Sequence, residues 1–513
     1  MNRRSLLALT LPVLALGATP VPAAAASAVP VTVPSIRRFD GGPGQFTRTA
    51  DTRIVASGAA AAVAQLLAGD LARGGRAVAV ASGPARPGDV VLRVDAAGPP
   101  EPESYRIDIG DVVTLHARTR QGLTHATQTL LQWFSRSATL PGGVATDWPD
   151  FTERGLLLDV GRQFLSVDWI KQRIREMAFY RMNLLQLHLS DRFGFRLESS
   201  SRPEITSAQH YSRADLTEIL SYAADFGIEV IPEIGFPGHM NAILAPYPEM
   251  VLHPAATGLV DAVTDGLLAG TAEGRLDLSH PGAGQLLEDL LHEFVPMFPG
   301  RYFHLGGDEY VSDFSRYPQL TAAARARLGP EAGGADLVAH HVNWANGIVR
   351  SYGRTARLWN DGIPRGTSLP VDTSIIVDHW TGGGGLLPWA GNDNGPEQLA
   401  DQGYVLSNSA FTPTYWASGG YAAPMNAPTG LLYAWDPGLF VTGARLRPDQ
   451  RARLLGSKLH VWCDDPTAMT EQQMIGPVRE RLPIMAQQLW SGTGGIGYAD
   501  FAERVRILGV PTA

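Results

Sequence analysis

Short apolar runs recur along the chain from Phe151 onward, and most are separated by segments with apolar residues at helical spacing. Runs of this length without alternation are typical of strands that are buried on both faces of a parallel sheet. The predicted strands are 155–159, 183–190, 228–234, 302–306, 355–359, 374–380, 404–407 and 457–462. The predicted helices include 167–181, 213–226, 285–298 and 336–352, with Ser212 and Asp215 as a capping box for the second of these. Strands that alternate with helices in this way predict a (β/α)8 barrel, which we assign to residues 151–508.

Two connections depart from the alternation. The segment between the fifth and sixth predicted strands is too short for a good helix. Residues 409–448 carry no clear pattern, and we expect a long loop there.

The first part of the chain predicts a separate, smaller domain over residues 31–148. Strand-like runs at 90–94, 105–109 and 112–116 alternate with helical patterns at 61–71 and 122–133, which indicates a compact α/β domain. Residues 142–149 are rich in Gly, Pro and Asp and form the predicted linker to the barrel.

The first 28 residues follow the plan of a secretory signal peptide. Arg3 and Arg4 precede an apolar run from Leu6 to Leu16, and small residues follow up to Ala28. The adjacent arginines also permit a twin-arginine signal. A membrane anchor is the alternative, but the apolar run is short for a spanning helix. We therefore expect a secreted protein that has no membrane contact after signal removal.

Composition narrows the class of partner. The formal net charge of -8 and the absence of basic runs argue against nucleic acid and favour a neutral or polar small substrate. Cys463 is the only cysteine, so the chain cannot form an intramolecular disulfide.

Two consecutive acids follow the fourth predicted strand of the barrel. Side chains of neighbouring strand residues point to opposite faces, so Asp308 and Glu309 can share one pocket only where the backbone bends. Gly306 and Gly307 permit that bend. Acids that converge at a strand end indicate acid–base chemistry, although an isolated acidic pair is as often solvated at a turn.

Other chemistry-bearing residues follow the predicted strands, at the end of a barrel where active sites lie. They are Asp159, Arg162, His188, Asp191, Glu233, His239, Trp359, Asp361, Asp378, Trp380, Tyr415, Trp462 and Asp464. Each alone could be structural, but together they predict a sugar site in which aromatic faces stack on pyranose rings and acids bind hydroxyls. Metal binding by His188, Asp191, Glu233 and His239 is the competing interpretation. Because these residues lack a recognised zinc spacing, we expect neither a metal nor another cofactor.

The stretch from His304 to Glu309 resembles the His-hydrophobic-Gly-Gly-Asp-Glu signature of glycoside hydrolase family 20, the β-N-acetylhexosaminidases. The resemblance extends over most of the chain and is specific. It implies a catalytic (β/α)8 barrel behind a small α/β domain.

The resemblance also implies a role for each matching residue. It places Asp308 and Glu309 on the catalytic pair and Tyr415 on the tyrosine that hydrogen-bonds the acetamido carbonyl. In the implied mechanism the substrate's 2-acetamido oxygen attacks the anomeric carbon, with net retention. Glu309 would protonate the leaving oxygen, and Asp308 would stay ionised and hold the acetamido N–H. The implied substrate-binding residues are Arg162, Asp191, His239, Trp359, Trp380, Trp462 and Asp464.

Four positions depart from the family pattern. Residues 191–195 read Asp-Arg-Phe-Gly-Phe where Asp-Asp-Gln-Gly-Trp is common, and Gly235 stands where an Asp is usual. Ala417 replaces the Asp of Tyr-x-Asp, and Asp464 replaces the Glu of Trp-x-Glu. These positions are where hydroxyls of the terminal sugar are recognised. The shorter Asp464 suggests a pocket that admits a disaccharide, as in the lacto-N-biosidases of the same family.

We therefore expect a secreted, retaining exo-glycosidase whose partner is a glycan with terminal β-linked N-acetylhexosamine, GlcNAc or GalNAc. One alternative is a lacto-N-biosidase that releases Gal-β1,3-GlcNAc. A carbohydrate-binding homologue without turnover is the other alternative, and the presence of Asp308, Glu309 and Tyr415 disfavours it.

Overall fold

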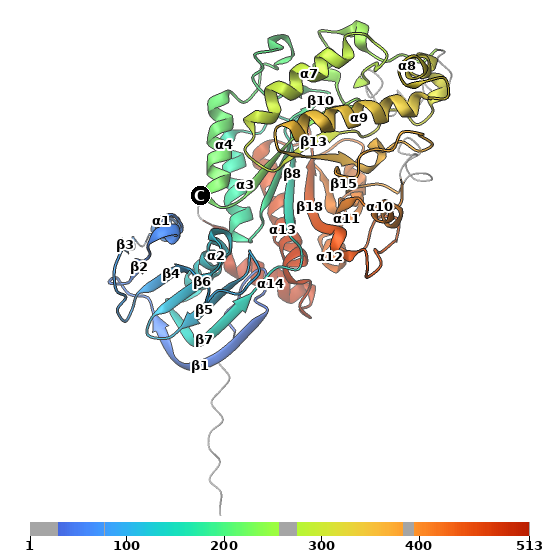
Figure 1. Ribbon diagram of the computed structural model, residues 1–513. Coiled ribbons are helices and arrows are strands. Elements are labelled where there is room, and N and C mark those ends of the chain that lie inside the picture. Colours follow the sequence, from blue (N-terminus) through green and yellow to red (C-terminus); the bar gives the residue numbers. More distant parts are fainter. Residues whose placement is uncertain (1–28, 76, 256–273, 383–393, 512–513) are drawn as a thin grey trace, which may run out of the picture.

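The structure is a computed structural model that describes residues 29–75, 77–255, 274–382 and 394–511. The predicted signal peptide, residues 1–28, lies outside this part of the chain. Figure 1 shows a small N-terminal domain in blue beside a larger domain in which helices surround a central set of strands. Over the described ranges, we find no helix of the length and apolar character needed to cross a membrane.

The N-terminal domain is built on a seven-stranded sheet with the strand order β1-β7-β5-β6-β4-β2-β3. Helix α2 buries Leu123, Leu130 and Trp133 in the core of this domain and begins at Thr119, whose hydroxyl accepts a hydrogen bond from the Gly122 N–H. Helices α1 and α2 pack against each other and against the sheet. The elements are β1 (Arg38–Thr47), β2 (Arg53–Val55), α1 (Ala61–Arg73), β3 (Ala79–Ala81), β4 (Val90–Val94), β5 (Tyr105–Ile109), β6 (Val113–Ala117), α2 (Arg120–Arg136) and β7 (Thr139–Asp147).

The predicted linker at 142–149 is wrong over residues 142–147, because strand β7 continues to Asp147. Strands β1 and β7 pair antiparallel and approach each other closely. A Cβ atom on Gly143 would lie 2.6 Å from the carbonyl oxygen of Asp40. Glycine therefore serves the close approach of two strands here, rather than a flexible connection between domains.

The larger domain confirms the predicted (β/α)8 barrel. Its eight parallel strands form a closed ring, in which β18 pairs with both β8 and β16. The predicted bounds of the fourth and fifth strands are those of the structure. The ring consists of β8 (Glu153–Asp159), β9 (Leu184–His188), β12 (Glu229–Phe236), β13 (Tyr302–Gly306), β14 (Thr355–Trp359), β15 (Ile376–His379), β16 (Val405–Asn408) and β18 (Leu454–Trp462).

Helices cover the outside of the barrel (Figure 1). The predicted capping box of α4 is confirmed, because the Ser212 hydroxyl accepts from the Asp215 N–H and the Asp215 carboxylate accepts from the Ser212 N–H. The helices are α3 (Val167–Phe179), α4 (Arg213–Asp225), α5 (Asn241–Leu244), α7 (Ala283–Phe294), α8 (Pro318–Leu328), α9 (Gly334–Ser351), α10 (Pro396–Gln402), α11 (Phe411–Thr414), α12 (Thr429–Ala434), α13 (Glu471–Ser491) and α14 (Tyr498–Leu508). A short hairpin, β10 (Ser190–Asp191) and β11 (Gly194–Phe195), follows β9.

The two irregular connections turn out differently. The connection from β14 to β15 contains only a 3-10 turn at Asn360–Gly362, as its short length predicted. The predicted long loop at 409–448 is wrong, because it contains α11, α12 and the extra strand β17 (Tyr415–Ala417). Strand β17 pairs with the end of β18, beyond the part that pairs with β16, and places Tyr415 opposite His460.

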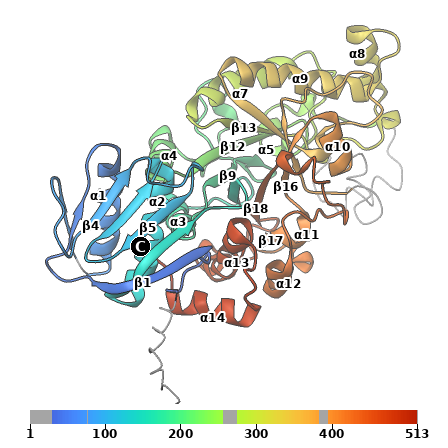
Figure 2. The ribbon, with the colours of Figure 1, turned by 60° about the horizontal axis from the view of Figure 1, so that its bottom comes forward.

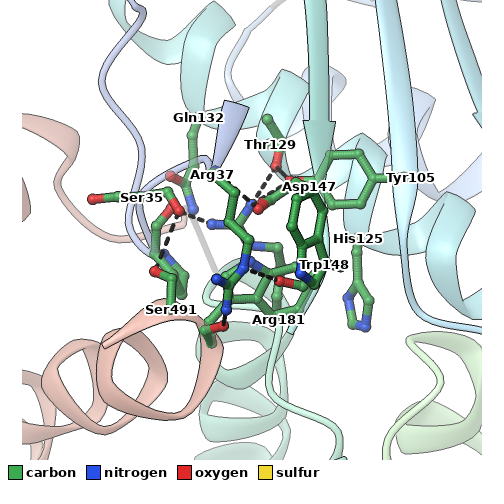
Figure 3. Close-up of polar contacts among 12 residues, drawn as sticks. Ser35, Arg37, Tyr105, His125, Thr129, Gln132, Asp147, Trp148, Arg181 and Ser491 are labelled. Carbon is green, nitrogen blue, oxygen red and sulfur yellow. Dashed lines mark hydrogen bonds and ion pairs between the residues drawn. The ribbon is translucent and has the colours of Figure 1, made fainter. Parts of the chain in front are cut away.

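The two domains share a buried polar interface (Figure 3). Arg181, which follows α3 of the barrel, forms an ion pair with Asp147 of β7 at 2.9 Å and also donates to Tyr105 and Thr129. Its guanidinium lies 4.6 Å from the ring centre of Trp490, a residue of α13 that is buried in the core of the N-terminal domain. Figure 2 shows α13 and α14, in red, beside the blue N-terminal sheet. The C-terminal helices therefore join the two domains into one packed unit.

Candidate active site

A cavity opens at the carboxyl ends of the barrel strands. The residues predicted to act in catalysis or substrate binding all line it except Asp191, which is buried behind Arg162 and His239. The lining residues are Arg162, His239, Asp308, Glu309, Trp359, Trp380, Tyr415, Tyr421, Ala422, Trp462 and Asp464. Because the strands of the barrel are parallel, residues from distant parts of the chain meet at this one end.

The backbone after β13 bends as the two glycines predict. Gly306 and Gly307 have φ angles of 75° and 98°, and Glu309 has a φ of 53°, which is rare for a residue with a side chain. A Cβ atom on Gly306 would lie 2.5 Å from the Cα of Gly235, and one on Gly307 would lie 2.6 Å from Leu358. The bend turns the consecutive residues Asp308 and Glu309 into the same cavity.

His239 links the two acids to a third one. Its Nε2 lies 3.1 Å from Glu309 Oε2 and 3.4 Å from Asp308 Oδ2, and its Nδ1 lies 3.2 Å from Asp191 Oδ2. Burial alone would lower the pKa of His239, but the charges of Asp308 and Asp191 outweigh burial and hold this pKa well above its usual value. His239 therefore carries a positive charge between three carboxyl groups.

That positive charge bears on the state of Asp308. Burial raises the pKa of Asp308, and the negative charges of Glu233 and Glu309 raise it further, whereas His239 lowers it. The expectation that Asp308 is ionised therefore depends on the neighbouring His239 cation.

Arg162 is held by a cluster of acids and shares one of them, Asp191, with His239. Its guanidinium lies 2.9 Å from both Asp159 Oδ2 and Asp191 Oδ2, and 3.9 Å from Asp464 Oδ1. The second carboxylate oxygen of Asp464 is buried and has no hydrogen-bond partner in the described part of the chain. Burial raises the pKa of Asp464 to about 6. Arg162 and Asp464 thus present a donor and an acceptor to a polar ligand.

Four aromatic side chains form the remaining walls. The rings of Trp380 and Tyr415 are nearly parallel, with an interplanar angle of 12° and centres 6.4 Å apart. Trp462 lies between Tyr415 and Trp359, at 5.6 Å and 6.3 Å between ring centres. A flat, apolar ligand group would be enclosed on several sides by these rings.

Buried acids fix two of the tryptophans. The indole N–H of Trp359 donates to Glu233 at 2.7 Å, and that of Trp380 donates to Asp361 at 2.8 Å. Glu233 and Asp361 were both predicted at strand ends, and Glu233 was also considered as a metal ligand. Their contacts identify them as supports of the aromatic walls.

Tyr421 is a lining residue that the sequence did not indicate. It lies in the segment predicted as a structureless loop, and no motif or periodic pattern includes it. Its side chain lines the cavity although the residue is 53% exposed. A wall residue with this exposure stands at the mouth of the cavity, and only the folded chain brings it there.

The four residues considered as metal ligands bind each other instead. His188 Nε2 lies 3.0 Å from Asp191, and its Nδ1 lies 3.0 Å from Glu233. Burial alone would lower the pKa of His188, but the charge of Glu233 and hydrogen bonds to both acids raise it to about 10. An imidazole protonated at both nitrogens cannot ligate a metal. Within the described ranges, no group of three His, Cys, Asp or Glu residues has the geometry of a metal site.

Both domains of the chain match models of one protein family. Residues 151–493 match the family model "Glycosyl hydrolase family 20, catalytic domain", and residues 29–148 match the model of domain 2 of the same family. A lacto-N-biosidase of Bifidobacterium bifidum is 29% identical over 90% of this chain, which spans only 40% of that relative's length. A β-N-acetylhexosaminidase of Cellulomonas fimi is also 29% identical, over 91% of this chain and 90% of the relative.

Solved structures show the same fold over both domains. A mutant β-hexosaminidase of Streptomyces plicatus in complex with its product GlcNAc superposes with a TM-score of 0.72 at 26% identity, covering 93% of this chain and 94% of that one. The β-N-acetylhexosaminidase of Streptomyces coelicolor gives a TM-score of 0.73 at 26% identity, covering 94% of this chain and 98% of that one.

Proposed function

The chain belongs to glycosyl hydrolase family 20 and is a glycoside hydrolase, and we propose that it removes terminal β-linked N-acetylhexosamine, GlcNAc or GalNAc, from glycans with retention of configuration. The observation that carries this proposal is the position of Asp308 and Glu309 in one cavity whose other walls are Trp359, Trp380, Tyr415 and Trp462. The acids supply the chemistry, and the aromatic walls suit a planar acetamido group held beside them.

The proposed reaction has two steps, with the substrate's acetamido oxygen as the nucleophile. In the first, this oxygen bonds to the anomeric carbon, the bond to the leaving oxygen breaks, and Glu309 gives its proton to that oxygen. In the second, Glu309 takes a proton from water, whose oxygen attacks the anomeric carbon and reopens the oxazolinium ring. The sugar leaves with its acetamido group restored.

Neighbouring residues would prepare the acetamido group for this attack. Asp308 would accept the acetamido N–H and offset the positive charge that grows on the ring as it forms. The hydroxyl of Tyr415 would donate to the acetamido oxygen and orient it toward the anomeric carbon. His239, at 3.1 Å from Glu309, supports the proposal because its charge stabilises Glu309 after the proton has left.

An assay with aryl glycosides tests this proposal. Aryl β-GlcNAc and β-GalNAc should be hydrolysed, and the matching aryl β-glucoside, which lacks the nucleophile, should be inert. A thiazoline mimic of the oxazolinium should inhibit far more tightly than GlcNAc, because it resembles the high-energy intermediate. Hydrolysis of the plain glucoside at a comparable rate, or weak inhibition by the thiazoline, would contradict substrate-assisted catalysis.

The space around Asp464 favours a second candidate, a lacto-N-biosidase that releases Gal-β1,3-GlcNAc. Asp464 is shorter than the usual Glu and keeps a buried oxygen free of hydrogen-bond partners within the described residues. A Cβ atom on Gly235 would meet no atom closer than 3.8 Å, so the Asp that is usual there could be accommodated but is missing. The shorter acid and its unpaired oxygen support the second candidate, in which an additional galactose is bound.

The Asp464→Glu variant separates the two candidates. The longer acid reclaims the space of the galactose, so activity on an aryl lacto-N-bioside should fall relative to activity on aryl GlcNAc. A wild-type enzyme that cleaves only the simple GlcNAc glycoside would exclude the enlarged pocket and leave the first candidate intact. Absence of turnover on aryl GlcNAc, aryl GalNAc and aryl lacto-N-bioside would favour a carbohydrate-binding protein without catalytic activity.

Two further expectations complete the proposal. We propose that catalysis is independent of metal, so that EDTA leaves the rate unchanged, and zinc-restored activity would contradict this. We also propose export by the N-terminal signal, which N-terminal sequencing of protein recovered from the medium would test.

A further inference from the structure

Asp361 lies in the 3-10 turn that follows β14, between the strand that carries the two acids and the strand that leads to Trp380. Its two carboxylate oxygens serve different partners. Oδ2 accepts the backbone N–H of Glu309 at 2.8 Å, and Oδ1 accepts the indole N–H of Trp380, also at 2.8 Å. One side chain thus connects the backbone of Glu309 with a wall of the cavity.

We propose that Asp361 is a positioning residue that sets the carboxyl group of Glu309 and the indole of Trp380 at a fixed distance from each other. This inference depends on the function proposed above, in which Glu309 is the general acid. Asp361 does not need to touch the substrate in this role. It would keep the proton donor and the acetamido wall in the mutual placement that the first step requires.

The backbone of Glu309 needs such an external support. Its φ of 53° lies in the left-handed region, which L residues with side chains adopt only where surrounding structure holds them there. The hydrogen bond from its backbone N–H to Asp361 Oδ2, at 2.8 Å, supplies such a support. Without that bond the residue could relax toward an ordinary conformation, and its carboxyl group would leave the position beside His239.

The turn itself is anchored so that Asp361 can act as a support. The Asn360 side chain accepts a hydrogen bond from the backbone N–H of Trp380 at 2.8 Å and donates one to the Thr381 carbonyl oxygen at 2.9 Å. A Cβ atom on Gly362 would lie 3.0 Å from the Cα of Gly307. This close approach of two glycines brings the turn within hydrogen-bonding distance of the Glu309 backbone.

Burial, together with the negative charge of Asp308, raises the pKa of Asp361 to about 8. At neutral pH Asp361 is therefore mostly uncharged and adds little repulsion to Asp308 and Glu309. A neutral carboxyl group can still accept both N–H donors.

The Asp361→Asn variant tests the proposal. An asparagine has a single side-chain oxygen, so one of the two N–H donors would face an NH2 group instead of an acceptor. The measured quantity is kcat/KM, which reports the first step, for two β-GlcNAc substrates with a poor and a good leaving group. A displaced Glu309 should matter more when the leaving oxygen needs a proton. The kcat/KM for the poor leaving group, divided by that for the good leaving group, should therefore fall at least about tenfold.

This ratio does not depend on the fraction of the variant that folds, because both substrates are assayed on the same preparation. Asn360→Ala is the matched control, since it loosens the Trp380 end of the turn without removing the acceptor of the Glu309 N–H. It should lower both values of kcat/KM by the same factor. If Asp361→Asn does not fold, Asp361→Ser gives the same test with a smaller side chain.

Two outcomes are to be kept apart. An unchanged ratio in the Asp361 variant, whatever the total loss of activity, would overturn the positioning role and leave the proposed function standing. A wild-type protein that hydrolyses neither substrate would overturn the proposed function itself.

Discussion

Replacing Arg181 with methionine tests how much stability the contact between the two domains provides (Figure 3). Methionine is unbranched and can fill much of the same space, but it removes the guanidinium with its contact to the Trp490 ring and its hydrogen bonds to Tyr105, Thr129 and Asp147. The variant should unfold at a lower urea concentration than the wild type, because it leaves Asp147 buried without its cation.

The magnitude follows from the burial of the pair. Both side chains are 0% exposed, and their charged atoms lie 2.9 Å apart. Removing one partner of a buried pair costs about 3–5 kcal/mol, because the other charge is left behind. Asp147 keeps hydrogen bonds from the Tyr105 hydroxyl at 2.7 Å and the Arg37 backbone N–H at 3.1 Å. Burial already raises the pKa of Asp147, so its carboxyl group can take up a proton when Arg181 is gone. We therefore expect the lower end, about 3 kcal/mol.

Urea unfolding, followed by far-UV circular dichroism and by tryptophan fluorescence, measures this cost. Both signals should change together in the wild type, because the two domains share one interface. The double variant Arg181→Met/Asp147→Leu is the matched control, and it should be more stable than Arg181→Met alone because no unpaired charge remains. A loss below about 1 kcal/mol for Arg181→Met, the range of an exposed ion pair, would refute the reasoning.

Three further predictions concern the site and the interface. Glu309→Gln should abolish hydrolysis of glycosides with poor leaving groups and spare activated aryl glycosides more, because the latter need little protonation; equal loss in a kcat/KM comparison would contradict the acid role. Asp308→Asn should lower kcat by about 10²-fold or more, as expected for one preorganised transition-state contact, and a rate near that of the wild type would remove Asp308 from the mechanism. At the domain interface, Glu103 lies 2.9 Å from His125 of α2 and pairs with Arg154 of β8. The free energy of unfolding should rise with pH between about 2 and 6.5, because Glu103 and His125 bind fewer protons in the folded state. Arg154 and His125 outweigh the burial of Glu103 and lower its pKa from 4.5 to about 2, and burial lowers the pKa of His125 from 6.5 to about 4. Urea titrations across this range measure the slope, which Glu103→Gln should reduce, and an unchanged slope in that variant would assign the pH dependence to other groups.

The barrel could be predicted because its strands carry a strong local signal. Residues 302–306 and 355–359 are short apolar runs bounded by turn residues, and the structure places both strands at those bounds. The failures occurred where tertiary contacts override local pattern. Gly143 indicates a linker by composition, but it permits close contact between β1 and β7. Strand β17 has only three residues, and it forms because the free edge of β18 is available to it.

Most of the residues that line the cavity were among those predicted at strand ends, but Tyr421 was not, and the pairing of the side chains could not be predicted. A parallel barrel brings the carboxyl ends of all its strands to one edge, so polar residues that follow the strands in sequence lie near one another in space. Which acid faces which base depends on side-chain directions that no spacing encodes. The sequence could not tell, for example, that His188 faces Glu233 and that His239 faces Asp191.

The sequence is likewise insufficient to tell whether the pocket binds a monosaccharide or a disaccharide. The sequence shows that Asp464 is shorter than the usual Glu, but the consequence depends on what surrounds the missing methylene group. In the structure Arg162 holds one oxygen of Asp464 at 3.9 Å, and the other oxygen is buried without a partner in the described part of the chain. A buried acceptor is costly when unpaired, so a bound hydroxyl at this point would add affinity. Because Gly235 and Ala417 have no polar side chain, we expect the choice of sugar to depend on the polar residues that do line this part of the cavity, namely Arg162, Asp464 and Tyr421.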